Sequence, residues 1–407
     1  MTSKRVVITG LGLVTSIGTG KTEFWRNLLS GKSGTSPVRA FDTSSYDVHV
    51  GAEIPDFEPN LYIRNGRSST MGRCSQLAIA AARLALEDSG LNQPDLSEKI
   101  VGTVLGTTMG EPQVLEEIDR IWVQEGFEQI PAELVPRYAC HIIPTNVALE
   151  FGFRGPNMMI PTACSAGNYA IGYASDLLKL GRVDVALAGG ADCFSRIAFT
   201  GFARVGAIAP EVCRPFDKNR KGMLVGEGAC ILILETLEHA KRRGAEIYAE
   251  VLGYGLGCDA YHMTGSHPEG LGLVRAMERA LKQSGVSTED VDYIGAHGTG
   301  TPTNDRTETL AIKRVFSNGS AYRVPVSSIK SMIGHTMGAA SAIEGAACVM
   351  SVRDNVVPPT MNYNEKDPDC DLDYIPNVAR DHKVDVALNN SAAFGGLNAV
   401  LVLGKMQ

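Results

Sequence analysis

Short apolar runs alternate along the chain with longer segments in which apolar residues recur every three or four positions. The runs IVGTVLGT (100–107) and NMMIP (157–161) are typical of buried strands, because they are brief and mostly apolar. The segment SAGNYAIGYASDLLKLG (165–181) instead carries an apolar face at helical spacing. Strands that alternate with helices in this way predict an α/β protein whose parallel sheets are covered on both faces.

The first strand, RVVITG (5–10), runs into the sequence Gly10-Leu11-Gly12. This resembles the start of a dinucleotide-binding fingerprint, but Thr15 stands where the third glycine is required. We therefore interpret the segment as a strand followed by a glycine-rich turn, and not as a nucleotide site.

The chain repeats its own pattern. VDVAL occurs at 183–187 and again at 384–388. The helix endings LALEDSG (84–90) and RALKQSG (279–285) are each closed by a glycine, and each is followed by a strand that ends in Gly-Thr. A repeat of this length indicates a duplicated domain and not a solenoid.

We expect two similar α/β halves, residues 1–251 and 252–407, packed around a pseudo-twofold axis. Such packing brings equivalent strand ends from both halves into one crevice. Ligands of α/β sheets bind in crevices of this kind, beyond the carboxyl ends of the strands.

Composition narrows the function classes. The chain has 407 residues and a net charge of −7, which disfavours general nucleic-acid binding. No stretch reaches the roughly 18 apolar residues of a membrane span. The nine cysteines are scattered without a C-x-x-C pair, so we expect no disulfide framework and no metal site. A cytoplasmic protein fits this cysteine usage best.

Cys164 lies in PTACSAGN (161–168), between a predicted strand and a predicted helix. Unpaired amides and the helix dipole favour an anion there, so we expect a lowered thiol pKa. The small neighbouring residues leave room for a thioester, and the amides can hold an oxyanion. Alternatively, Cys164 is only a small buried hydrophobic residue, which is a common use of cysteine.

Histidines follow two predicted strands of the second half. His297 lies in GAHGTGTPTND (295–305), at a strand end before a turn that contains Thr299 and Thr301. Taken alone, His297 is better explained as a turn residue that caps a loop.

The segment VPVSSIKSMIGHTMGAASAIEGAA (324–347) carries Lys330, His335 and Glu344. We expect a strand that leads to Lys330, and an alanine-rich helix that opens at Gly334-His335. By the internal repeat, His335 occupies a position near that of Cys164 in the first half. A solvated turn lysine and a helix-capping histidine are the alternative interpretation.

Together, one cysteine, two histidines and one lysine exceed what a cysteine hydrolase needs, which is one base and one orienting group. They suit formation of a carbon–carbon bond. A thiol accepts an acyl group, a second thioester loses CO₂, and two imidazoles donate hydrogen bonds to the enolate oxygen that develops.

The sequence resembles the β-ketoacyl-acyl-carrier-protein synthases, or ketosynthases, of the synthase II-like condensing enzymes in the thiolase superfamily. The motifs that carry the resemblance are TACSAG (162–167), RPFDKNRKGMLVGEGA (214–229), DAYHMT (259–264), AHGTGTPTND (296–305), IKSMIGHTMGAA (329–340) and the closing FGG (394–396). They occur in the family's order and span essentially the whole chain. The resemblance implies a thiolase-like fold of duplicated α/β halves, layered α-β-α-β-α.

The resemblance also implies roles for the four residues of the constellation. Cys164 accepts the acyl group, and His297 and His335 hold the thioester carbonyl of malonyl-acyl-carrier protein and promote its decarboxylation. Lys330 is the electrostatic partner of the site, with Glu344 as structural support. The product is a 3-ketoacyl-acyl-carrier protein.

Further implied roles concern the walls and surroundings of the site. The backbone N–H groups of Cys164 and Phe394 form the oxyanion hole, and Thr299 and Thr301 bind the phosphopantetheine arm. The family uses no metal or redox cofactor, and the phosphopantetheine arm arrives on the carrier protein. Its members are usually homodimers. The candidates for a basic patch that docks the acidic acyl carrier protein are Arg64, Arg67 and Arg204.

Two departures from the family pattern concern substrate binding. The family loop Phe-Gly-Phe-Gly-Gly begins here with Ala392-Ala393, ahead of Phe394 and Gly395, so one aromatic ring of the gate is missing. Met223 replaces a phenylalanine that lies against the malonyl carboxylate in the family. We therefore expect a condensing enzyme of a specialised polyketide or fatty-acyl pathway. The alternatives are a housekeeping fatty-acid elongation synthase and, less favoured because Cys164 is present, a non-catalytic chain-length partner of a ketosynthase heterodimer.

Overall fold

The computed structural model describes residues 4–317 and 319–406. The strands of the first half are β1 (Val6–Thr15), β5 (Val101–Gly106), β6 (Asn157–Ile160), β7 (Val185–Asp192) and β8 (Gly228–Thr236). The principal helices of this half are α2 (Arg73–Ser89), α5 (Ile142–Phe151) and α6 (Ala166–Lys179). The predicted strand before Cys164 and the predicted helix after it are thus β6 and α6.

The second half repeats this architecture. Its strands are β9 (Ala249–Cys258), β10 (Tyr293–Gly295), β11 (Val326–Ser327), β14 (Val386–Ser391) and β15 (Leu397–Gly404), and its principal helices are α9 (Leu271–Ser284), α10 (Pro302–Val315) and α12 (Ala340–Asp354). The strand orders are β6-β5-β7-β8-β1 and β11-β10-β14-β15-β9, so equivalent strands occupy equivalent places. This identity of order confirms the predicted duplication.

The remaining elements connect or flank these. They are the helices α1 (Lys21–Leu29), α3 (Gln93–Leu96), α4 (Pro112–Glu125), α7 (Arg196–Arg204), α8 (Leu237–Arg242) and α11 (Lys330–Ile333), and the short strands β2 (Gly18–Thr19), β3 (Ser36–Pro37), β4 (Val50–Gly51), β12 (Val356–Val357) and β13 (Arg380–Asp381).

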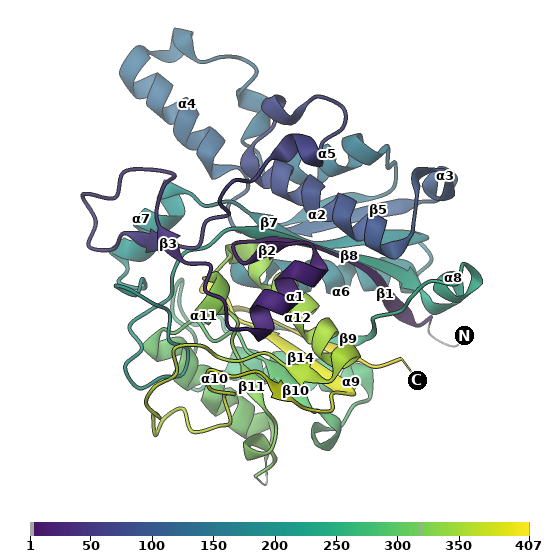
Figure 1. The fold of residues 1–407 in the computed structure, drawn as a ribbon, viewed down its shortest axis with the longest axis vertical. Helices are drawn as coiled ribbons and strands as arrows, with labels where there is room; N and C mark the ends of the chain where they lie inside the picture. Colours follow the sequence, from purple (N-terminus) through teal and green to yellow (C-terminus); the bar gives the residue numbers. More distant parts are fainter. Residues whose placement is uncertain (1–3, 318, 407) are drawn as a thin grey trace.

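The layers follow the order helix, sheet, helix, sheet, helix (Figure 1). Helices α2 and α5 cover the outer face of the first sheet, and α9 and α10 cover that of the second. Helices α6 and α12 lie between the sheets and pack against each other. The apolar side chains of α6 and α12 share one core with strands of both halves, which is why the two halves cannot separate without exposing that core.

The sheets are mixed, and the prediction of wholly parallel sheets is wrong. Strands β5, β6 and β7 are parallel, whereas β8 pairs antiparallel with β7 and with β1. The segment between β7 and β8 returns along the same end of the sheet instead of crossing a face with a helix, so β8 must run in the opposite direction. The pairs β14–β15 and β15–β9 are likewise antiparallel.

Strand β1 continues through the glycines that we expected to form a turn, with a shift of register between Ile8 and Gly10. A side chain at Gly12 would overlap the backbone of Ala81 in α2, and one at Gly10 would overlap that of Ala85. The glycines are therefore needed for close packing of a helix on a strand, and not for chain reversal.

The two halves join where β1 pairs with β9, at Val7–Glu250 and Ile8–Ala249. The division at residue 251, which lies within β9, stays a prediction. None of the helices in the described part of the chain has the length and apolar character that crossing a membrane requires.

Candidate active site

Cys164 lies in a 3₁₀ turn, Ala163–Ser165, that links β6 to α6. Ala163 has a φ of 50°, a left-handed conformation that is costly for a residue with a side chain. The second half holds this turn in place. The Ser391 hydroxyl donates to the carbonyl of Cys164 at 3.2 Å, and the Ser165 hydroxyl donates to the carbonyl of Leu397 at 2.7 Å.

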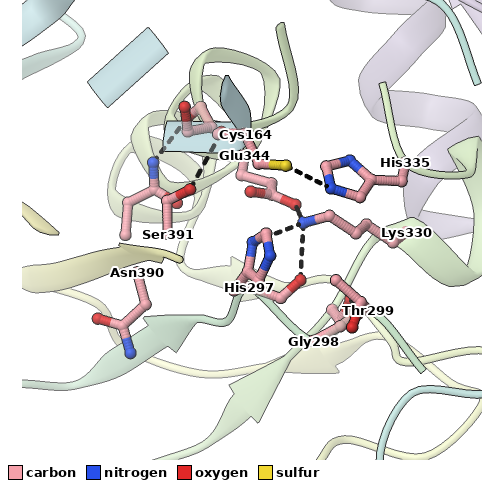
Figure 2. A network of polar contacts seen from close by, with 12 residues as sticks. Cys164, His297, Gly298, Thr299, Lys330, His335, Glu344, Asn390 and Ser391 are labelled. Atoms are coloured by element: carbon pink, nitrogen blue, oxygen red, sulfur yellow. Dashed lines mark hydrogen bonds and ion pairs between the residues drawn. The ribbon is translucent and has the colours of Figure 1, made fainter. Parts of the chain in front are cut away.

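His335 brings its ring against the thiol, with Nε2 3.1 Å from Sγ of Cys164 (Figure 2). The predicted helix start at this residue is wrong, since α12 begins only at Ala340. His335 instead lies extended, and its N–H donates to the carbonyl of Leu224 at 2.7 Å. The Met337 N–H donates to Nδ1 of His335 at 3.2 Å, so the ring proton belongs on Nε2.

His297 follows β10 and is held from two sides. Its N–H and that of Gly298 each donate to the Glu308 carboxylate at 2.8 Å. Lys330 Nζ donates to the carbonyl of His297 at 2.6 Å and lies 3.4 Å from Nδ1 (Figure 2). An ammonium group has no acceptor, so Nδ1 must accept and Nε2 carries the proton. The rings of His297 and His335 are 5.5 Å apart, centre to centre, and nearly perpendicular.

Lys330 forms an ion pair with Glu344 of α12 in the protein interior (Figure 2). Lys330 is fully buried, and Glu344 is 3% exposed, so the alternative of a solvated lysine is excluded. Burial raises the pKa of Glu344 to about 7, although the ammonium of Lys330 acts in the opposite direction. Removing one partner of such a pair typically costs about 3–5 kcal/mol, because the other is left charged in the core.

The thiol of Cys164 is desolvated. Burial raises its pKa to about 12, and this outweighs the opposing effect of Lys330. The lowered pKa that we predicted from the helix N-terminus is therefore wrong, because the loss of water around the sulfur is the larger effect. Burial, with Lys330 acting in the same direction, also lowers the pKa of both His297 and His335, so both imidazoles are neutral.

One cavity of about 280 Å³ contains the thiol and both imidazoles. Of the residues predicted to bind substrate, those that line it are Met223, Thr299, Thr301, Ala392 and Ala393. Phe394, which was predicted to complete the oxyanion hole, lines it too. The hydroxyls of Thr299 and Thr301 are 2.8 Å apart. Gly395 does not line the cavity, and its N–H donates to the carbonyl of Met263 at 2.7 Å.

The three candidate docking arginines occupy different surroundings. Arg204 is exposed at the end of α7, next to Val205 and Gly206, which line the cavity. Arg64 lines a separate pocket and pairs with Glu87 at 3.2 Å. Arg67 is partly buried just before α2. Only Arg204 is thus adjacent in sequence to residues of the cavity wall.

Sequence reasoning missed the carboxylates that hold the site loops. Glu308 binds the backbone at His297, and Asp305 accepts from the N–H groups of Gly300 at 3.1 Å and Phe216 at 2.7 Å. Both are buried in α10. Their position in the first turns of the helix after the GAHGTGT segment was the available signal, since carboxylates favour helix starts. The signal did not reveal which loop they bind.

A second cluster with possible metal-ligand geometry consists of Cys74, Glu111 and Cys193, whose ligand atoms lie within 4.8 Å of one another. Both oxygens of Glu111 accept from the first turn of α2, at Cys74 N–H and Ser75 N–H. The sulfur of Cys74 accepts from the Cys193 N–H at 3.0 Å. Hydrogen bonds within the protein therefore account for this cluster.

A thiol that shares a cavity with neutral hydrogen-bond donors is suited to transfer of an acyl group between thiols. Fold and site thus define an acyltransferase with the duplicated halves of a thiolase. Two family models match the chain, those of the N-terminal domain of β-ketoacyl synthase over residues 3–240 and the C-terminal domain over residues 248–364. The chain belongs to the β-ketoacyl synthase family.

Individual proteins of this family are similar over the full chain. A 3-oxoacyl-[acyl-carrier-protein] synthase 2 of Coxiella burnetii is 40% identical, with 100% of each chain covered. The tetracenomycin polyketide synthase ketoacyl synthase alpha subunit of Streptomyces glaucescens is 41% identical, covering 99% of this chain and 97% of that protein. The solved structure of the ishigamide ketosynthase/chain length factor is 45% identical with a TM-score of 0.97 over 100% of both chains. The ketosynthase resemblance, the thiolase-like fold and the acyltransferase class are confirmed.

The raised pKa of Cys164 predicts slow alkylation by iodoacetamide at neutral pH. Because the thiolate is the nucleophile, the rate should rise about tenfold per pH unit from pH 7 to 10. Peptide mass spectrometry would follow Cys164, with the exposed Cys258 as the internal reference. A rate for Cys164 that is already constant between pH 7 and 8 would contradict a pKa of about 12.

Proposed function

We propose that the chain catalyses a decarboxylative Claisen condensation between an acyl group held on Cys164 and malonyl-acyl-carrier protein. The observation that carries the proposal is the 3.1 Å approach of His335 Nε2 to Sγ of Cys164, with the His297 ring alongside. One cavity can thus hold the acyl thioester and the second thioester together.

In the first half-reaction, the sulfur of Cys164 attacks the thioester carbonyl of an acyl-acyl-carrier protein. The backbone N–H groups of Cys164 and Phe394 stabilise the oxyanion. The bond to the phosphopantetheine sulfur then breaks, and the proton of the Cys164 thiol ends on that leaving sulfur. With its raised pKa, the thiol gives up its proton only as the new bond forms.

In the second half-reaction, malonyl thioester loses CO₂, and its electrons form an enolate. The protonated Nε2 atoms of His297 and His335 donate hydrogen bonds to the enolate oxygen. Both rings are neutral, because their pKa values are lowered. The enolate carbon attacks the acyl carbonyl on Cys164. The Cys164 sulfur leaves and takes up one proton, and 3-ketoacyl-acyl-carrier protein is released.

Lys330 fixes the orientation of the His297 ring, and Glu344 holds Lys330 through their ion pair. Lys330 holds Nδ1 as an acceptor, which keeps Nε2–H directed at the substrate. Thr299 and Thr301 bind the phosphopantetheine arm at the mouth, which the carrier protein supplies without a separate cofactor. The acidic carrier protein docks on basic residues, with Arg204, next to the cavity wall, as the first candidate. Arg64 and Arg67, which do not line the cavity, are the further candidates.

The pathway that we infer is specialised polyketide or fatty-acyl assembly. Ala392 and Ala393 leave room where the family carries a gate ring, and Met223 is more flexible than the family's phenylalanine. The similarity to the ishigamide ketosynthase and the tetracenomycin synthase subunit supports this choice. The second candidate is housekeeping fatty-acid elongation, which the comparable identity to the Coxiella burnetii synthase favours. Cys164 argues against a non-catalytic chain-length partner.

We also infer that the chain acts as a homodimer. Apolar side chains on and after α4 are exposed, with Trp122 59%, Val123 85% and Phe127 70% accessible, and α4 projects from the body of the molecule (Figure 1). An exposed apolar surface of this kind is typical of a subunit interface. A heterodimer with a chain-length-factor subunit is the alternative, because the ishigamide relative is described with one.

Intact-mass analysis with a panel of acyl-acyl-carrier proteins should show one acyl adduct, which Cys164→Ala abolishes. Addition of malonyl-acyl-carrier protein should then release CO₂ and 3-ketoacyl product. An adduct on another cysteine would refute the site, and the lack of product with every primer would refute the condensation.

Ala392→Phe should narrow the range of primers that acylate Cys164, because the ring fills the mouth of the cavity. Acylation by an acetyl group, which is small, should remain within about twofold of the parent rate. Single-turnover acylation of both proteins with short and long primers measures this. An unchanged range of primers would show that the side chain at position 392 does not control entry to the cavity.

Light scattering after gel filtration should give twice the mass of a single chain. Val123→Glu should yield monomer, because it places a charge in the proposed interface. Val378→Glu, at a residue 72% exposed elsewhere, is the matched control and should remain dimeric. A parent protein that dimerises only after co-expression with a chain-length-factor subunit would refute the homodimer in favour of the heterodimer.

A further inference from the structure

Asp192, the last residue of β7, is a buried carboxylate that the chemistry above does not use. Its oxygens accept hydrogen bonds from the Thr107 hydroxyl at 2.7 Å, the Thr108 N–H at 2.7 Å and the Met109 N–H at 3.4 Å. A further bond comes from the other half of the molecule, because the Gly338 N–H donates to Asp192 at 2.6 Å.

Gly338 lies in the segment 335–338 (the 335–338 turn), which leads from His335 into the 3₁₀ helix Met337–Ala339. In this turn the Met337 N–H donates to Nδ1 of His335, and Met337 itself has a left-handed φ of 53°. Left-handed backbone is unfavourable for methionine, so the surroundings must hold it. The contact with Asp192 on the adjacent N–H is one such restraint, and the packing of the buried Met337 side chain is another. A side chain at Gly338 would also lie 2.5 Å from Thr107, so the turn sits directly on the loop that Asp192 binds.

We infer that Asp192 is a positioning residue for His335. Its carboxylate fixes the 335–338 turn, the turn directs the Met337 N–H at Nδ1, and this bond keeps the proton of the ring on Nε2, which faces the Cys164 sulfur. Asp192 does not line the cavity, so it acts on the direction of the His335 ring through the turn. Its negative charge also contributes to the raised pKa of the Cys164 thiol.

A carboxylate suits this position because every group around it is a donor. Two oxygens without protons can accept all four hydrogen bonds, whereas an asparagine would direct its own N–H₂ group at backbone N–H groups. Burial raises the pKa of Asp192 to about 6, and the hydrogen bonds from Thr107, Thr108 and Gly338 oppose that rise. The same hydrogen bonds that fix the position of Thr107, Thr108 and Gly338 therefore stabilise the negative charge of the buried Asp192 carboxylate.

Asp192→Asn is the test, with Asp217→Asn as the matched control. Asp217 is also fully buried and accepts from the backbone N–H groups of Asn364 and Glu365, but it does not contact the 335–338 turn. Nitrogen-15 histidine NMR reports the tautomer of His335, with His335→Gln used for assignment. In the parent protein we expect one tautomer, protonated at Nε2.

We expect Asp192→Asn to give mixed tautomers of His335 and to lower kcat for malonyl decarboxylation about 10- to 100-fold, the loss expected from a misplaced catalytic group. KM should change little. Asp217→Asn should preserve the tautomer, and Asp192→Glu, which keeps the carboxylate, should restore it in part. An unchanged His335 signal in Asp192→Asn, or the same mixture in the Asp217 control, would overturn the inference.

The kinetic readout rests on the proposed function, whereas the NMR readout does not. Absence of decarboxylation by the parent protein would therefore refute the proposed function alone. Should Asp192→Asn fail to fold by circular dichroism, Thr107→Val carries the test, because it removes one donor to the carboxylate at nearly constant volume. It should shift the tautomer in the same direction by a smaller amount, and an unchanged signal would again overturn the inference.

Discussion

The two imidazoles of the site are each held through Nδ1, and the chemistry depends on this constraint. At His335 the holding group is a backbone N–H, and at His297 it is the buried ammonium of Lys330. Both arrangements leave a protonated Nε2 in a cavity that contains the Cys164 thiol. Because the rings are neutral, they can donate to a developing negative charge without first carrying a positive one.

The duplicated architecture explains how one site obtains such different parts. Equivalent strand ends of the two halves meet, but the first half supplies the thiol and the second supplies the donors and the ion pair. Contacts between the halves then fix the geometry, as when Ser391 holds the turn of Cys164. The central helices α6 and α12 bind the two halves into a single core, so the relative position of thiol and imidazoles is as rigid as that core.

The sequence allowed prediction of the duplication, the strand and helix flanking Cys164, and the histidines and lysine of the site, because each is recorded in local pattern or in motif. It did not predict the antiparallel strands β8 and β15, since strand direction depends on where the connecting segment passes in three dimensions. The thiol pKa was predicted in the wrong direction, because burial is a property of the assembled fold. The roles of Glu308 and Asp192 were missed for the same reason. Glu308 binds the backbone N–H of His297 on the far side of a turn, and Asp192 binds the backbone N–H of Gly338 in the other half of the chain.

The desolvated sulfur also bears on how the enzyme withstands oxidants. Peroxide attacks the thiolate form of cysteine, and sulfenic acid formation needs access to the sulfur. Cys164 is 7% exposed and holds its proton to a pH well above neutral, so between turnovers it is a poor target. Burial of the sulfur therefore has two consequences. The thiol loses its proton only when a thioester is bound, and the free thiol is protected from oxidation to the irreversible sulfinic and sulfonic acids.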